Sequence, residues 1–285
     1  MQPGHINLNG QLLPALPESL TEVQRAFLYG DGLFETIRVF NGLAPYWPVH
    51  WQRLSRGFKL LGFMPPVTWT ENFFKAEIER ITYPNARIRL TVWRSPGGSY
   101  LPTDHKPQFL VTAEPLQVDY FEWLDQGLNI CLCTSVQLPA DTLSGLKMLG
   151  GNRYVAAARE AQSKGRDDGI ILSTIGTISE ATSSNVFWIK NGEVFTPAPG
   201  AGQVSGTLFS VLGFVLQTNG RNLHEKSATP KDLLDADELF LTNAIRGIRW
   251  VREFEGVQYG CKKTKHIHQL LNEDLKERMA EKSGF

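Results

Sequence analysis

Apolar residues recur along the chain at two periods, and segments with a period of two alternate with segments of helical period. Residues 184–190 are expected to form a strand with Asn185, Phe187 and Ile189 on one face. Asn191-Gly192 is a preferred two-residue hairpin turn, and residues 193–196 return as a second strand. From Leu208 onward apolar residues recur at every third or fourth position, which predicts a helix that ends at Asn219-Gly220. This part of the chain is therefore expected to form a hairpin, a loop and a helix.

The same two periods predict the other elements. A hairpin is expected at 5–13, with further strands at 33–40, 87–94, 108–113, 128–134, 169–173, 238–243, 248–254 and 257–259. Helices are expected at 48–61, 68–80, 152–163, 231–234 and 264–282, and residues 21–29 are helical or irregular. This mixture predicts an α/β or α+β chain with two lobes. We expect a smaller N-terminal domain at 1–113, a linker at 114–126 and a larger C-terminal domain at 127–285.

Composition narrows the class of protein. The chain has 285 residues and is 42% apolar, which suits a globular protein with a large core. Its 29 basic and 29 acidic residues cancel, so charge gives no reason to expect nucleic acid or an anionic membrane as a partner. No apolar run approaches the roughly 18 residues of a membrane span, and the first residues lack the pattern of a signal peptide. Cys131, Cys133 and Cys261, without a histidine pattern for zinc, favour a reducing cytoplasm and no metal.

A lysine and a glutamate are candidates for chemistry. Lys147 is a single cation among small and apolar residues, and a lysine in such surroundings can act as an amine nucleophile or base. The alternative is a lysine that extends from a loop into solvent, which is the commoner case for a lone lysine. Glu180 lies just before the strand at 184–190, where it is either a functional carboxylate or an exposed one at a strand edge.

A loop rich in glycine and proline, residues 197–206, leads into the helix near Leu208. The start of a helix offers backbone N–H groups and the positive end of the helix dipole, and both favour a bound phosphate. The alternative is a connecting loop without a ligand, since most glycine-rich loops are only turns. The loop by itself leaves both interpretations open.

Several motifs occur in a fixed order along the chain. They are Gly30-Asp31-Gly32-Leu33-Phe34-Glu35-Thr36-Ile37-Arg38, His50-Trp51-Gln52-Arg53-Leu54, Leu146-Lys147, and Glu180-Ala181-Thr182-Ser183-Ser184-Asn185-Val186-Phe187 followed by residues 194–196 and 204–206. Together they resemble the class IV aminotransferases, the pyridoxal-phosphate enzymes of fold type IV, over nearly the whole chain. The resemblance implies the two-domain fold of D-amino acid aminotransferase with a cofactor site between the domains, pyridoxal 5'-phosphate as cofactor, and a homodimer.

The resemblance also implies a role for individual residues. Lys147 would bind the cofactor aldehyde through its amine, and Glu180 would hold the pyridine nitrogen protonated. Arg53 would bind the phosphate, although an arginine on a helix can equally be an ordinary surface residue. Further cofactor contacts are expected from the backbone after Gly206, at Thr207 and Leu208, and from Thr182, Ser183, Asn243 and Ala244.

The chain departs from the family pattern at several positions. Residues 207–209 stand where relatives continue with a branched residue, threonine and arginine. Ala244 stands where branched-chain and D-amino acid enzymes have a threonine, and Phe34 replaces the tyrosine of the D-amino acid enzyme. Tyr154 is two places too far from Lys147 to match the tyrosine that relatives often carry. These departures bear on the reaction more than on the cofactor.

Two stretches, residues 89–100 and 242–244, resemble the deoxychorismate lyase branch of the family. That branch releases pyruvate and forms 4-aminobenzoate for folate synthesis. Because its substrate carries two carboxylates, we expect arginines to meet it, with Arg38, Arg94 and Arg246 as candidates. Each of them has an alternative role as a surface or salt-bridged arginine. An aminotransferase of branched-chain or D-amino acids with 2-oxoglutarate is the first alternative function, and a binding protein without catalysis is a remote one.

Overall fold

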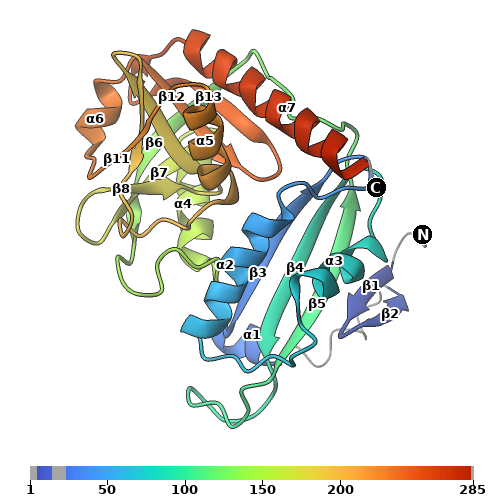
Figure 1. Ribbon diagram of the computed structural model, residues 1–285. Helices are drawn as coiled ribbons and strands as arrows, with labels where there is room; N and C mark the ends of the chain where they lie inside the picture. The colour runs from blue at the N-terminus through green and yellow to red at the C-terminus, as the bar shows by residue number, and fades with distance from the viewer. Residues whose placement is uncertain (1–4, 15–23, 284–285) are drawn as a thin grey trace. The chain divides into compact units, whose positions relative to one another are not determined.

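The computed structural model describes residues 5–14 and 24–283. The chain divides into two compact units (Figure 1): residues 1–119 with 146–150 and 282–285, and residues 120–145 with 151–281. The segment 146–150 carries Lys147 and belongs with the first unit, whereas the sequence suggested that it lies inside the second domain. Within the described residues, none of the helices is both long and apolar enough to cross a membrane.

The first unit is an antiparallel sheet covered by helices. Its elements in chain order are β1 (His5–Leu8), β2 (Gln11–Pro14), α1 (Gln24–Tyr29), β3 (Gly32–Val39), α2 (Trp47–Leu60), α3 (Glu71–Glu79), β4 (Ala86–Arg94) and β5 (Pro107–Pro115). The strand order is β2-β1-β5-β4-β3. The strands predicted for this part of the chain are confirmed, and the helix predicted at 48–61 is α2, with Pro48 in its first turn. Helix α3 is shorter than the predicted 68–80, because the Thr70 side chain accepts a hydrogen bond from the N–H of Phe73 and caps the helix there.

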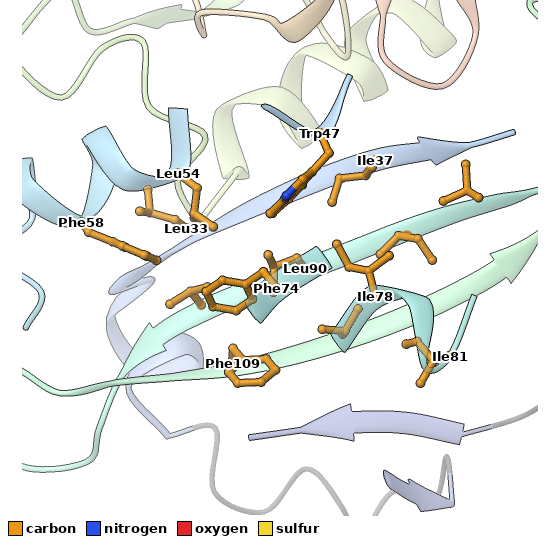
Figure 2. Packing of buried hydrophobic residues seen from close by; sticks show 14 of the residues in the cluster. Leu33, Ile37, Trp47, Leu54, Phe58, Phe74, Ile78, Ile81, Leu90 and Phe109 are labelled. Carbon is orange, nitrogen blue, oxygen red and sulfur yellow. The ribbon is translucent and has the colours of Figure 1, made fainter. Parts of the chain in front are cut away.

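The core of this unit lies between the sheet and the helices α2 and α3. Figure 2 shows aromatic and aliphatic side chains from these helices packed against β3, β4 and β5; the labelled residues are Leu33, Ile37, Trp47, Leu54, Phe58, Phe74, Ile78, Ile81, Leu90 and Phe109. Since side chains alternate along a strand, Leu33, Glu35 and Ile37 face the helices. Phe34, Thr36 and Arg38 therefore lie on the opposite face, where Thr36 pairs with Arg89 of β4.

The second unit is a mixed sheet with helices. Its elements are β6 (Leu128–Leu138), α4 (Asn152–Ser163), β7 (Asp168–Ser173), β8 (Ile178–Ala181), β9 (Asn185–Lys190), β10 (Glu193–Pro197), α5 (Thr207–Thr218), β11 (Leu223–Lys226), α6 (Pro230–Leu234), β12 (Glu238–Asn243), β13 (Gly247–Phe254), β14 (Val257–Gln258) and α7 (Lys262–Ser283). The strand order is β11-β10-β9-β12-β13-β6-β7-β8, with β14 beside β13. Strands β10 and β11, β13 and β6, and β6 and β7 pair in parallel, and the other pairs are antiparallel.

The hairpin, loop and helix of the sequence analysis appear as β9, β10 and α5, whose apolar residues Leu208, Val211, Leu212, Val215 and Leu216 are all buried. Two strands were not predicted. Strands β8 and β11 each have four residues and carry polar side chains, so neither shows a clear period of two. Their partners β7 and β10 make them strands, and β8 matters here because it carries Glu180.

We expect Phe74→Ala to destabilise the first unit strongly. Phe74 is fully buried and contacts the rings of Trp51, Trp69 and Phe109. Its truncation should lower the free energy of unfolding by roughly 3–5 kcal/mol, because the rigid aromatic surroundings cannot close the cavity. Urea unfolding measures this change. In the control Val67→Ala, the side chain is 96% exposed, and the change should stay within about 0.5 kcal/mol.

Candidate active site

The backbone of β3 places Lys147. The N–H of Phe34 donates to the carbonyl oxygen of Lys147 at 2.9 Å, and the N–H of Leu149 donates to the carbonyl of Gly32 at 2.9 Å. Residues 146–150 therefore run beside the first strand of the motif that the sequence singled out. The Lys147 Nζ atom lies 4.6 Å from the centre of the Phe34 ring, which is cation–π distance.

Arg89 lies over the same ring. Its guanidinium carbon is 3.9 Å from the centre of Phe34. Burial, and to a smaller extent the charge of Arg87, lowers the pKa of Arg89. Arg89 is not among the substrate arginines expected from the sequence. The two-residue period of residues 87–94 places Arg89 on one face of a strand. That face can be identified as the one beside Phe34 only once the pairing of β4 with β3 is known.

A buried ion cluster holds Arg53. The Glu35 side chain is 1% exposed, and both of its oxygens accept hydrogen bonds from Arg53, at 2.8 Å from Nε to Oε1 and by a second bond from Nη2 to Oε2. His50 Nδ1 lies 2.6 Å from Glu35 Oε2. Burial by itself would raise the pKa of Glu35, but the charge and hydrogen bonds of Arg53, followed by those of His50, lower it to about 2. Arg53 is therefore a fixed, largely buried guanidinium and not a surface arginine.

The pKa of His50 depends on both the buried cluster and Lys147. Burial lowers the pKa of His50 below 6.5, although its hydrogen bond to the Glu35 carboxylate opposes the change. The positive charges of Arg53 and Lys147 lower it further. Neither Glu35 nor His50 was selected from the sequence, although both lie inside motifs that were quoted there. Their roles depend on β3 and α2 packing together.

Glu180 is buried on β8 and is 4% exposed. Its Oε1 atom accepts hydrogen bonds from the Tyr154 hydroxyl at 2.6 Å and from the N–H of Val204 at 3.0 Å. Its Oε2 atom accepts one from the Asn185 side-chain amide at 3.2 Å. Burial, followed by the charge of Glu180 and its hydrogen bond, raises the pKa of Tyr154 far above its usual 10. An exposed strand-edge carboxylate is therefore excluded for Glu180.

The start of α5 has the geometry expected of a phosphate-binding helix end. Gly206 precedes the helix and has no side chain to cap it, and Thr207 and Leu208 form the first turn with their side chains buried. The Asn185 amide also donates to the Val204 carbonyl at 2.9 Å. A Cβ atom at Gly206 would lie 1.7 Å from Asn185 Oδ1, so only glycine fits at this position. The dipole of such a helix favours an anion at its N-terminus.

The other predicted cofactor residues shape the loops around β8 and β12. The Thr182 hydroxyl donates to buried Asp168 at 2.6 Å, and its N–H donates to the same oxygen at 3.0 Å. Asn243 Oδ1 accepts hydrogen bonds from the N–H groups of Ile245, at 3.1 Å, and Arg246, at 2.8 Å. Ser183 is exposed and Ala244 is half-buried on these two loops.

The predicted substrate arginines differ in their surroundings. Arg94 is buried and donates to Asp31 at 3.0 Å and to the carbonyls of Leu61 at 2.6 Å and Gly62 at 3.2 Å. These bonds give Arg94 a structural role in the first unit. Arg38 is also buried and donates to the Val118 carbonyl at 2.6 Å, whereas Arg246 is exposed in the second unit. Arg89 therefore replaces Arg94 among the candidates for substrate contact.

Because Glu35 is ionised and buried beside Arg53, we expect Glu35→Gln to destabilise the protein by about 3–5 kcal/mol at pH 7. The pKa of Glu35 is lowered from 4.5 to about 2, so the stabilisation by its carboxylate is complete above pH 4.5 and is lost as the pH falls through 2. This loss amounts to about 3 kcal/mol. The difference in unfolding free energy between wild type and variant should therefore shrink between these pH values. A difference that stays constant with pH would contradict the ionised state assigned to buried Glu35. The control is Glu114→Gln at an exposed ion pair, which should lower the free energy of unfolding by at most about 1 kcal/mol.

Comparison with known proteins gives the family. The sequence profile described as amino-transferase class IV matches residues 32–254. The chain is 27% identical to the aminodeoxychorismate lyase of Vibrio harveyi, over 79% of this chain and 83% of that protein. It is 30% identical to a putative branched-chain-amino-acid aminotransferase of Methanocaldococcus jannaschii, over 95% of each. A putative 4-amino-4-deoxychorismate lyase of Legionella pneumophila superposes with a TM-score of 0.78 at 26% identity, over 88% of this chain and 93% of that one. The chain belongs to the class IV aminotransferase family.

Proposed function

We propose that this chain binds pyridoxal 5'-phosphate and acts as a lyase that releases pyruvate from an amino-deoxychorismate, leaving 4-aminobenzoate. The proteins named aminodeoxychorismate lyase from Vibrio harveyi and Bacillus subtilis are each 27% identical to this chain. These relatives favour the lyase over an aminotransferase, and the observation that supports a substrate with a carboxylate is the pair of cations on one ring. Lys147 Nζ and the Arg89 guanidinium carbon lie 4.6 Å and 3.9 Å from the centre of Phe34. A carboxylate bound by Arg89 would therefore lie near the reacting amine.

The residues fit the chemistry of this cofactor. Lys147 supplies the amine, Glu180 a buried carboxylate for the pyridine nitrogen, and Arg53 a guanidinium for the phosphate. The backbone after Gly206 supplies the start of a helix, which suits the same phosphate. The phosphate would thus meet a charged group that Glu35 already holds in place, so little side-chain freedom is lost on binding.

Each residue has a defined task in the proposed reaction. When bound, the cofactor supplies an electron sink for the substrate carbon that carries the amino group. Lys147 Nζ would take the proton from that carbon, and Glu180 would hold a proton on the pyridine nitrogen. Arg89 binds a substrate carboxylate and orients the ring, with Arg38 and Arg246 as further candidates. The ring C–O bond to the enolpyruvyl group would then break, that group would take up a proton in place of the one removed and leave as pyruvate, and the substrate ring would become aromatic.

An aminotransferase is the second candidate, because the Methanocaldococcus jannaschii relative is 30% identical over 95% of the chain. An arginine beside the amine suits a dicarboxylate such as 2-oxoglutarate equally well. Product analysis separates the two reactions. The protein is incubated with aminodeoxychorismate while pyruvate and 4-aminobenzoate are measured, and separately with branched-chain or D-amino acids and 2-oxoglutarate while glutamate is measured. Fast glutamate formation without pyruvate would exclude the lyase.

The cellular setting is part of the same proposal. The family resemblance supports a homodimer that serves folate synthesis. The three free cysteines support a reducing, cytoplasmic setting. Neither nucleic acid nor a membrane is expected as a partner, since the net charge is zero. Sedimentation equilibrium of the purified chain tests the dimer, and a mass near 31.9 kDa would indicate a monomer.

Lys147→Ala should lower turnover by roughly 10³-fold or more, which corresponds to about 4 kcal/mol of activation free energy. The variant loses the group that attaches the cofactor and moves the proton. It should still bind pyridoxal phosphate through Arg53 and α5, but without the visible absorption of the covalently attached cofactor. Spectrophotometric titration and an assay for pyruvate measure both effects. Lys75→Ala, at an exposed lysine, is the control, and near-normal turnover of the Lys147 variant would refute the assignment.

Arg89→Gln should raise the KM for the dicarboxylate substrate roughly tenfold or more, because one charge-assisted contact of about 1.5–3 kcal/mol is lost. Arg87→Gln is a matched control, since Arg87 lies on the same strand and face but pairs with exposed Glu114 at 3.2 Å. Initial rates against substrate concentration measure the change. Equal KM values for the two variants would show that Arg89 does not contact the substrate.

A further inference from the structure

Tyr154 contributes a hydrogen bond to the Glu180 carboxylate that the sequence did not lead us to expect. It lies in the first turn of α4, and its hydroxyl donates to Glu180 Oε1 at 2.6 Å. Its ring packs beside the buried cluster that contains Cys133, Ala157 and Ile171. Nothing in the family resemblance accounts for this contact, because Tyr154 lies two places beyond the position at which relatives carry a tyrosine.

The hydrogen bond from Tyr154 is one of three described bonds that hold the Glu180 carboxylate. Oε1 accepts the phenol together with the N–H of Val204, whereas Oε2 accepts the Asn185 amide. The three donors come from α4, from the loop before α5 and from β9, so they hold the carboxylate from separate elements. All three are neutral hydrogen-bond donors, and each of them stabilises the negative charge. A hydrogen bond from a hydroxyl to a carboxylate is about twice as strong as a neutral one.

The phenol remains a donor across the working pH range. Burial, followed by the charge of Glu180, raises the pKa of Tyr154 far above its usual 10. Without the hydroxyl, Oε1 would keep the N–H of Val204 but lose its shortest bond. The carboxylate plane could then rotate, and the negative charge of a residue that is only 4% exposed would be less well solvated.

We propose that Tyr154 is a positioning residue that orients the Glu180 carboxylate toward the pyridine nitrogen of the cofactor. The proposal rests on the proposed function, in which Glu180 contacts that nitrogen. It goes further by assigning the strength of that contact to a tyrosine on α4. The competing explanation is that the hydroxyl merely satisfies a buried donor. That explanation predicts a loss of stability but no effect that depends on the ring nitrogen.

The test compares two cofactors. The full-length chain is freed of cofactor and titrated with pyridoxal 5'-phosphate, and separately with its 1-deaza analogue, in which a carbon replaces the ring nitrogen. Tyr154→Phe should bind pyridoxal phosphate about tenfold more weakly than wild type, but should bind the analogue within about twofold of wild type. Dissociation constants come from absorbance and need no turnover. The proposal predicts a parallel fall in kcat with little change in KM.

Tyr259→Phe is the matched control. Tyr259 is a buried tyrosine of the same unit, and its hydroxyl donates to the Leu233 carbonyl at 2.9 Å. Its loss should lower the thermal midpoint and leave both dissociation constants unchanged. If Tyr154→Phe fails to fold, Tyr154→Met lacks the same hydroxyl, and its flexible side chain can fill the space. The expectation for both cofactors is the same.

The outcomes separate the two proposals. Equal affinity of wild type and Tyr154→Phe for pyridoxal phosphate would overturn the role of Tyr154 and leave the proposed function intact. An equal loss of affinity for both cofactors would also overturn it, because the tyrosine would then act only as a wall of the site. A wild-type chain that does not bind pyridoxal phosphate would overturn the proposed function and this inference with it.

Discussion

The position of one lysine depends on backbone hydrogen bonds between two segments far apart in the sequence. Lys147 and Leu149 bond to Phe34 and Gly32 at the start of β3, so the segment 146–150 belongs with the first unit of the chain. Gly32 makes this possible, since a Cβ atom there would lie 2.4 Å from the carbonyl oxygen of Val92 and 2.7 Å from a Leu149 methyl carbon. These backbone bonds place Lys147 beside Phe34, with its Nζ atom 4.6 Å from the centre of the ring.

Two buried glutamates are stabilised in different ways, and the difference matches their proposed tasks. Glu35 is neutralised by the guanidinium of Arg53 and bonded to His50, so its charge is used within the protein. It acts on the proposed phosphate site only by holding Arg53. The named donors to Glu180 are a phenol, an amide and a backbone N–H. These neutral donors solvate its charge, which suits the contact with a protonated ring nitrogen that we propose.

The arginines also differ in whether their donors bind groups of the protein. A guanidinium whose donors are directed at backbone carbonyls and an aspartate, as in Arg94, stabilises the fold. A half-buried guanidinium that lies over an aromatic ring, as in Arg89, is the one that we propose for a substrate carboxylate. Family membership is consistent with either a lyase or an aminotransferase, because both reactions require the cofactor residues. The cations around Phe34 suit a carboxylate, which the substrates of both reactions carry, so they do not separate the two reactions.

The sequence by itself determined most of the elements, since hydrophobic period, turn residues and helix ends are local properties. Contiguous motifs that resemble a known family also pointed to Lys147, Glu180, Arg53 and the glycine loop, whereas residue type alone left the role of each one open. Tertiary structure decided what these residues touch. The short strands β8 and β11 exist only through their partners, and Glu35, Arg89 and Tyr154 acquire their roles from residues that lie 18, 55 and 26 positions away. Hydrogen bonds and charge act through space, so a pattern read along one dimension cannot locate them.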